Sequence, residues 1–158
     1  MELYLSAAAV LLSVISGIYS VIVHFSELRR ERRQATLDAF NLLQNEVLDQ
    51  LNLYRKSKIK EISEDPTAED YKKISSLLAR LEHFAVGVNE KIYDFKTVRC
   101  LAGRYLIGLY TKIEPMIEKK RQINKTQLHY EACEKLAMKL RRYYRCEPWI
   151  QANSSHGE

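Results

Sequence analysis

Glycine and proline are scarce in this chain, which has five glycines and three prolines among 158 residues. A fold rich in β-strands reverses direction often, and its turns draw heavily on these two residues. Leu, Lys, Glu, Ala and Arg are abundant instead, as in helical bundles. The composition therefore predicts an all-α protein, and the length suits one modest domain with an accessory element.

Motifs for catalysis and cofactor binding are also lacking. The histidines form no HExxH pattern, and no glycine-rich stretch carries the lysine and serine of a P-loop. Carboxylates at helical spacing, such as Glu131 with Glu134, have no histidine at the spacing of a carboxylate metal bundle. We predict no catalytic, cofactor-binding or metal-binding residue, no cofactor and no enzymatic activity. An enzyme whose site has no recognisable motif is kept as an alternative.

Cysteine is limited to Cys100, Cys133 and Cys146. An odd number of cysteines without metal-ligand spacing is typical of reduced thiols in the cytosol. We interpret these three residues as free thiols that mainly serve packing.

Positive charge is absent from the first 25 residues, where Glu2 is the only charged side chain. The run from Leu3 to Val23 holds 21 uncharged residues, and a helix of that length spans a hydrocarbon core of roughly 30 Å. A secretory signal would begin with basic residues, and a buried core helix would carry more polar positions. Residues 1–25 are therefore predicted to form a single transmembrane helix.

Four arginines follow this apolar run within five positions. Because short flanking segments rich in Lys and Arg stay on the cytoplasmic side, the N-terminus is predicted to face outward and the rest of the chain to lie in the cytoplasm. We call these residues the arginine collar: Arg29, Arg30, Arg32 and Arg33.

Small side chains recur along the apolar run at alternating steps of three and four residues. In lipid, small residues let helices approach closely, so this stripe predicts a homo-oligomer of the span. The alternative is that serine and alanine are tolerated anywhere in a membrane helix. We call the stripe the small-residue seam: Ser6, Ala9, Ser13, Ser16 and Ser20.

About four helices are predicted after the membrane, in an up-and-down bundle over residues 26–147. The first runs to about Ile62, and the second begins near Asp65 or Thr67. Asp94 caps the third, and Asn124 or Thr126 begins the fourth. Residues 148–158 are predicted to be a disordered tail. The expected core-facing stripes are Tyr71, Ile74, Leu78, Leu81, Ala85 and Val88, then Val98, Leu101, Tyr105, Leu109, Ile113 and Ile117, then Leu128, Ala132, Leu136, Leu140 and Tyr143.

Basic residues dominate the C-terminal third, where residues 118–145 hold nine Lys or Arg and three acidic residues. Such a strip attracts phosphates on a nucleotide, RNA or anionic lipid, although a solvated helix face explains it equally simply. If the last helix runs back toward the membrane, the strip approaches the arginine collar. Glu82 is expected to pair with Arg99 or Arg121. The anion-binding candidates are Lys135, Lys139, Arg141, Arg142 and Arg145.

Three stretches resemble a bacterial membrane-anchored family catalogued as domain of unknown function four-seven-six-zero. They are the segment "LEHFAVGV" at 81–88, Ile117 to Arg121, and the Tyr130 to Leu136 helix, and the resemblance covers about residues 1–145. It implies an N-terminal span followed by a helical region, in the inner membrane of a bacterium. The family carries no established activity that the resemblance could transfer.

Two functions of different kinds fit this organisation. The first is a membrane-tethered sensor or effector, whose cytosolic helices bind a protein partner or an anionic ligand and couple it to an oligomeric span. By analogy of design, bacterial stress signalling or antiviral defence would suit it. The second is a passive scaffold or adaptor that holds a cytosolic protein, including one associated with nucleic acid, at the membrane.

Overall fold

A computed structural model describes the backbone of residues 2–145 and the side chains of residues 12–145. Cys146 and the predicted tail over residues 148–158 lie outside the described residues, as do the side chains of Ser6 and Ala9. All the regular elements in the described part are helices, which confirms the all-α prediction.

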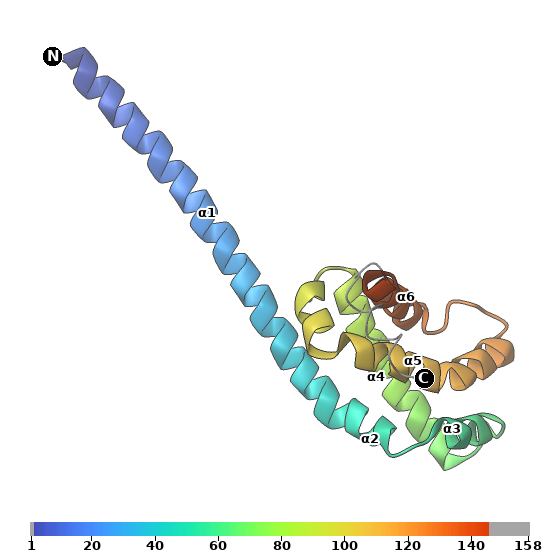
Figure 1. The fold of residues 1–158 in the computed structure, drawn as a ribbon. Coiled ribbons are helices and arrows are strands. Elements are labelled where there is room, and N and C mark those ends of the chain that lie inside the picture. Colours follow the sequence, from blue (N-terminus) through green and yellow to red (C-terminus); the bar gives the residue numbers. More distant parts are fainter. Residues whose placement is uncertain (1, 146–158) are drawn as a thin grey trace.

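One long helix, α1 (Glu2–Leu43), carries both the apolar run and the arginine collar (Figure 1). Its N-terminal part projects from the molecule as a rod, whereas its C-terminal part packs into the helical body. Phe40 and Leu43 are buried in the core of that body. α1 therefore joins the apolar run to the helical body without a break.

The first helix ends earlier than the sequence predicts. After α1 the chain continues through a π-helical turn, η1 (Gln44–Leu48), and a short α2 (Asp49–Asn52), and it then turns at Arg55, whose ψ of 157° is extended. A separate α3 (Lys56–Ser63) follows and packs against α5. The prediction of one helix to Ile62 is wrong, because Ile59 and Ile62 reach the core only if the chain turns back.

The body of the fold consists of α4 (Glu69–Asn89), α5 (Phe95–Asn124) and α6 (Glu131–Arg145). α6 runs back along α5, because Glu134 pairs with Arg121 and Tyr144 bonds to Arg99. α6 packs on both α4 and α5. All six residues predicted to form the buried face of α4 are buried. α4 begins after Ala68, while Asp65 accepts hydrogen bonds from Thr67 in the preceding turn instead of capping the helix.

Asp94 caps α5 as predicted, because its carboxylate accepts a hydrogen bond of 2.8 Å from the Thr97 backbone N–H. The predicted buried stripe is wrong at Leu101 and Tyr105, which are exposed. Its other four members are buried as predicted. Ala102 has φ −147° and ψ 19°, outside the helical range. Ala102 and Leu106 are buried instead, four and eight residues after Val98, a spacing that also keeps residues on one face of a helix.

α6 begins later than predicted. α5 continues to Asn124 and ends in a Schellman motif, in which Lys125 has a φ of 50° and the Thr126 N–H bonds to the Arg121 carbonyl. Residues 126–130 form a loop, and Leu128 is exposed there instead of packing in the core. The helix starts where Glu82 of α4 provides an acceptor for its first backbone N–H groups.

A membrane-spanning helix has to be both long and apolar. Among the residues that the structure describes, no helix is both long enough and apolar enough to cross a bilayer.

Candidate functional site

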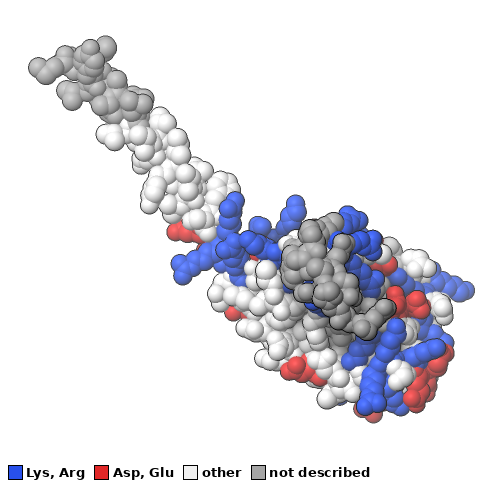
Figure 2. All heavy atoms as spheres, viewed as in Figure 1, with Lys and Arg blue, Asp and Glu red and all other residues white. Residues whose placement is uncertain are grey.

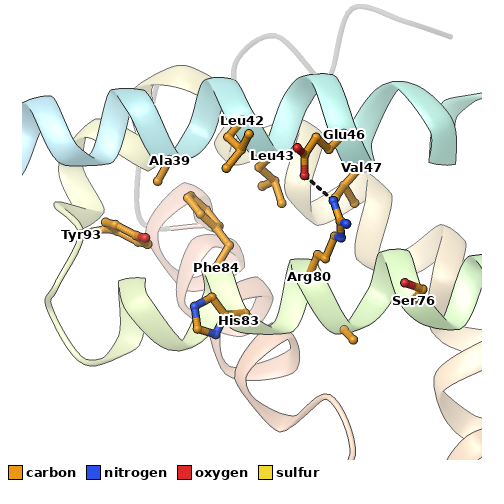
Figure 3. Close-up of a pocket in the computed structure, with 11 residues that line it drawn as sticks. Ala39, Leu42, Leu43, Glu46, Val47, Ser76, Arg80, His83, Phe84 and Tyr93 are labelled. Carbon is orange, nitrogen blue, oxygen red and sulfur yellow. Dashed lines mark hydrogen bonds and ion pairs between the residues drawn. The ribbon is translucent and has the colours of Figure 1, made fainter.

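A groove opens between the α1–η1 segment and α4, and side chains from both sides point into it (Figure 3). Its volume is about 460 Å³, and most of its lining is apolar. Glu46 of η1 and Arg80 of α4 form an ion pair across one end, and His83 lies on the α4 side. We call this the apolar groove, and its lining residues are Ala39, Leu42, Leu43, Glu46, Val47, Ser76, Ala79, Arg80, His83, Phe84 and Tyr93.

The π-helical turn shapes the η1 side of this groove. The Asp49 N–H bonds to the Gln44 carbonyl, five residues back, so this turn holds one more residue than an α-helical turn. Val47 and Leu48 pack into the core from this turn, while Glu46 stays exposed and reaches Arg80. π-helical turns occur often at functional sites, and sequence periodicity gave no signal for this one.

Stacked aromatic rings form the other end of the groove. The ring of Tyr93 stacks on that of Phe84 with centroids 5.4 Å apart, and Phe84 also contacts Phe40. Gly87 makes room for Tyr93, because a Cβ atom on Gly87 would lie 2.5 Å from the Tyr93 ring. The Tyr93 N–H also bonds to the Gly87 carbonyl at 3.0 Å. This end of the groove therefore depends on a glycine at position 87.

The predicted anion-binding residues do not form one continuous strip. Lys135 pairs with Glu131 at 2.9 Å, and Arg141 donates a hydrogen bond of 2.7 Å to the Thr111 hydroxyl. Lys139 lies over the Phe95 ring at 4.2 Å, near the start of α5. Arg142 and Arg145 are exposed. Lys135 is exposed as well, but its charge is paired with that of Glu131, so Lys139, Arg142 and Arg145 are the exposed members that we retain.

Two arginines of α5 that are not among the predicted anion-binding residues lie beside α6. The Arg99 guanidinium lies 3.7 Å from the Tyr143 ring centroid, and that of Arg104 lies 5.6 Å from the Tyr144 ring centroid. The Tyr144 hydroxyl also donates to the Arg99 carbonyl at 3.1 Å. Because these pairs join residues forty or more positions apart, no local sequence pattern reveals them.

The arginine collar lies next to the start of α5. The Asp94 N–H donates to the Thr36 hydroxyl at 2.7 Å, and that hydroxyl donates to the Arg32 carbonyl at 2.6 Å. Partial burial acts to raise the pKa of Asp94, but hydrogen bonds from Thr97 and the nearby Arg33 and Arg32 hold it below its ordinary value. Asp94 therefore remains ionised beside the collar near neutral pH.

Lys and Arg side chains gather where α1 meets the helical body (Figure 2). The Lys139 ammonium lies over the ring of Phe95. Phe95 directly follows Asp94, whose N–H bonds to Thr36 of α1. Lys139 of α6 therefore lies against the segment whose backbone contacts α1.

Glu82 does not pair with Arg99 or Arg121, so that expectation is wrong. Its carboxylate accepts backbone hydrogen bonds from Ala132 at 2.9 Å and Cys133 at 2.8 Å, at the N-terminus of α6. Arg121 pairs with Glu134 instead, at 2.7 Å. Burial, together with the neighbouring Glu82, raises the pKa of the Cys133 thiol well above its ordinary value, as expected of a packing residue.

The two described cysteines and the described part of the small-residue seam lie in different surroundings. Cys133 and Cys100 are both free thiols, but Cys100 is exposed, so it does not serve core packing. Ser13, Ser16 and Ser20 are exposed on α1. In the described part of the chain, no group of His, Cys, Asp and Glu side chains is arranged to hold a metal ion.

Among known proteins, one family model matches this chain. No curated protein and no solved structure matches the chain. The sequence model of the family described as "Domain of unknown function (DUF4760)" matches residues 7–140, most of the chain. The protein therefore belongs to this family, as the resemblance in its sequence implied.

Proposed function

We propose that this protein is a non-enzymatic, single-pass membrane protein whose cytoplasmic helical body binds a phosphate-bearing anion and couples that binding to an oligomeric N-terminal span. One observation carries the proposal: α1 is continuous from the uncharged run, through the arginine collar, to core residues such as Phe40 and Leu43. A helix without a break transmits a tilt or rotation of the body to its N-terminal part.

The tether is supported by the order of charges along α1. Residues 3–23 carry no charge, the arginine collar follows at once, and the bulk of the acidic residues lie beyond it. Along the described rod, the apolar side chains at 12, 14, 15, 18, 19, 21, 22 and 25 are all more than half exposed. An exposed apolar surface of this length favours a lipid environment, and the collar favours the cytoplasmic headgroup region.

The anion-binding surface is proposed at the junction between α1 and the helical body. It combines the arginine collar with Lys139, Arg142 and Arg145 of α6. Basic residues in one region attract phosphates largely without regard to sequence. We favour a soluble anion such as RNA or a nucleotide over lipid headgroups.

We expect the triple variant Lys139→Gln, Arg142→Gln and Arg145→Gln to bind a fluorescent RNA decamer about tenfold more weakly at low salt. The slope of log affinity against log salt should shrink by about two, because each phosphate contact with single-stranded nucleic acid contributes roughly 0.7 to it. Arg141 is kept, because it hydrogen-bonds to Thr111 within the fold. Fluorescence anisotropy measures both quantities on the full chain in vesicles of neutral phosphatidylcholine.

A matched control replaces three exposed lysines of α3 and the start of α4, Lys56, Lys60 and Lys72, by glutamine. This variant has the same net charge as the first and should bind nearly as well as the parent. Equal binding by both variants would contradict the proposed surface. Failure of the parent chain to float with the neutral vesicles after an alkaline wash would contradict the tether.

A further inference from the structure

An apolar stripe runs along α1 far beyond the proposed span. Its positions alternate in steps of four and three, the spacing that keeps residues on one side of a helix in a left-handed coiled coil. Only one of its nine members is charged. We call it the coiled-coil stripe, and its residues are Val14, Ile18, Val21, Phe25, Leu28, Arg32, Ala35, Ala39 and Leu42.

The C-terminal part of this stripe lies where lipid does not reach it. Leu42 is 17 residues after Phe25, which places it roughly 25 Å farther along the helix axis at 1.5 Å per residue. Leu28, one residue before the arginine collar, is 43% exposed, and Leu42, beyond the collar, is 59% exposed. These side chains therefore face water in the isolated chain, and burying them gives the hydrophobic gain that lipid-facing positions lack.

The stripe is also continuous with the apolar groove. Ala39 and Leu42 belong to both, and Leu42 lies on the α1 side of the groove (Figure 3). The regular spacing ends at η1, where the π-helical turn changes the register. A helix laid along the stripe would thus extend from the rod to the edge of the groove.

We infer that the coiled-coil stripe pairs with the same stripe of a second copy of this chain, as a parallel two-stranded coiled coil. The parallel direction rests on the proposed function, because a shared membrane orientation places all N-termini on one side. Identical heptad spacing on both chains brings Leu28 against Leu28 and Ala35 against Ala35 at d positions.

The charges beside the stripe fit this pairing. Arg32 occupies the single charged a position, and Glu31 precedes it at the neighbouring g position. In a parallel pair, the Arg32 of each chain is close to the Glu31 of the other. A lone polar residue at an a position lowers the stability of a coiled coil but specifies its register. Arg32 would then hold the two chains in alignment.

This pairing turns the small-residue seam away from the interface. With Ile18 at a and Val21 at d, Ser13 and Ser20 fall at c positions and Ser16 falls at an f position, on the outer side. The two stripes therefore predict different contacts, which cysteine cross-linking distinguishes.

The experiment uses the full chain in its native membrane, with Cys100→Ser, Cys133→Ala and Cys146→Ser as the background. Single cysteines are introduced on the stripe at Leu28→Cys and Ala35→Cys. Matched controls on the opposite side of α1 are Arg30→Cys and Arg33→Cys, both exposed positions. Ser16→Cys reports on the small-residue seam. Mild oxidation followed by non-reducing electrophoresis measures the disulfide-linked dimer.

Dimer is expected at the two stripe positions and not above background at the other three. Glu31→Arg reverses the charge at position 31 and should reduce the amount of disulfide-linked dimer formed by Ala35→Cys. Adding Arg32→Glu restores opposite charges at the two positions and should restore that amount. The inference would be overturned by any of three results: equal amounts of dimer at all positions, no dimer at positions 28 and 35, or dimer mainly at position 16.

Alkaline carbonate extraction of the same membranes separates this inference from the proposed function. A chain that is retained but does not cross-link on the stripe would leave the tether standing and refute the pairing. A chain that is extracted but shows the stripe pattern would refute the tether and support the pairing.

Discussion

Replacing Glu82 by alanine is expected to lower the free energy of unfolding by about 3 kcal/mol. The variant leaves the backbone N–H groups of Ala132 and Cys133 without their acceptor, and both are partly buried. It also removes a negative charge from the N-terminus of α6, where the helix dipole favours one. Because α6 packs on both α4 and α5, weakening its first turn affects the whole body of the fold.

Thermal unfolding of the full chain in neutral detergent, followed by circular dichroism, measures this loss. Glu118→Ala is the control, because Glu118 is an exposed acid within α5. Its effect should stay within about 0.5 kcal/mol. Glu82→Gln should fall between the two, since the amide keeps one acceptor oxygen but loses the charge. Equal stability of Glu82→Ala and Glu118→Ala would show that Glu82 does not stabilise the start of α6.

Replacing Gly87 by valine is expected to cost about 2 kcal/mol, or roughly 4–8 °C in Tm for a chain of this size. The added Cβ atom would lie 2.5 Å from the Tyr93 ring, so that ring has to leave its place against Phe84. The end wall of the apolar groove would move with it. The better helix propensity of valine offsets only a few tenths of a kcal/mol of this cost.

Gly108→Val provides the matched control, because a Cβ atom on Gly108 meets nothing within 4 Å. This variant should be as stable as the parent or slightly more stable. The contrast between the two glycines isolates the close contact with Tyr93 from the general effect of adding a side chain to a helix. If Gly87→Val and Gly108→Val unfold at the same temperature, the packing described for Tyr93 is wrong.

The sequence predicts local features of this fold well. The six buried residues of α4 and the cap at Asp94 follow from spacing and side-chain chemistry within one helix. The long α1 follows from the absence of proline in its apolar run and collar. Each of these features depends on residues a few positions apart.

The errors concern features that distant residues determine. The turn at Arg55 places Ile59 in the core against α5, and neither glycine nor proline marks it. The buried face of α5 runs through Ala102 and Leu106 instead of Leu101 and Tyr105, and helical spacing alone allows either pair. α6 begins where Glu82, about fifty residues earlier, meets its backbone. Propensity and periodicity do not report contacts over such separations.

In the candidate site too, the sequence predicts the local features and misses those that depend on distant residues. The charge of the collar and of α6 is visible in the sequence, but the pairing of Lys135 with Glu131 and of Arg141 with Thr111 depends on the fold. The apolar groove requires η1 and α4 to lie side by side, and nothing in either segment alone predicts it.

The most direct test of the proposed tether is the location of the C-terminus in cells. Alkaline phosphatase, which is active only outside the cytoplasm, and green fluorescent protein, which is fluorescent only inside it, are fused in turn after residue 158. The account predicts membrane-bound fluorescence that survives alkaline carbonate extraction, and inactive phosphatase. Active phosphatase would contradict the orientation set by the arginine collar, and fluorescence released by the extraction would contradict the tether itself.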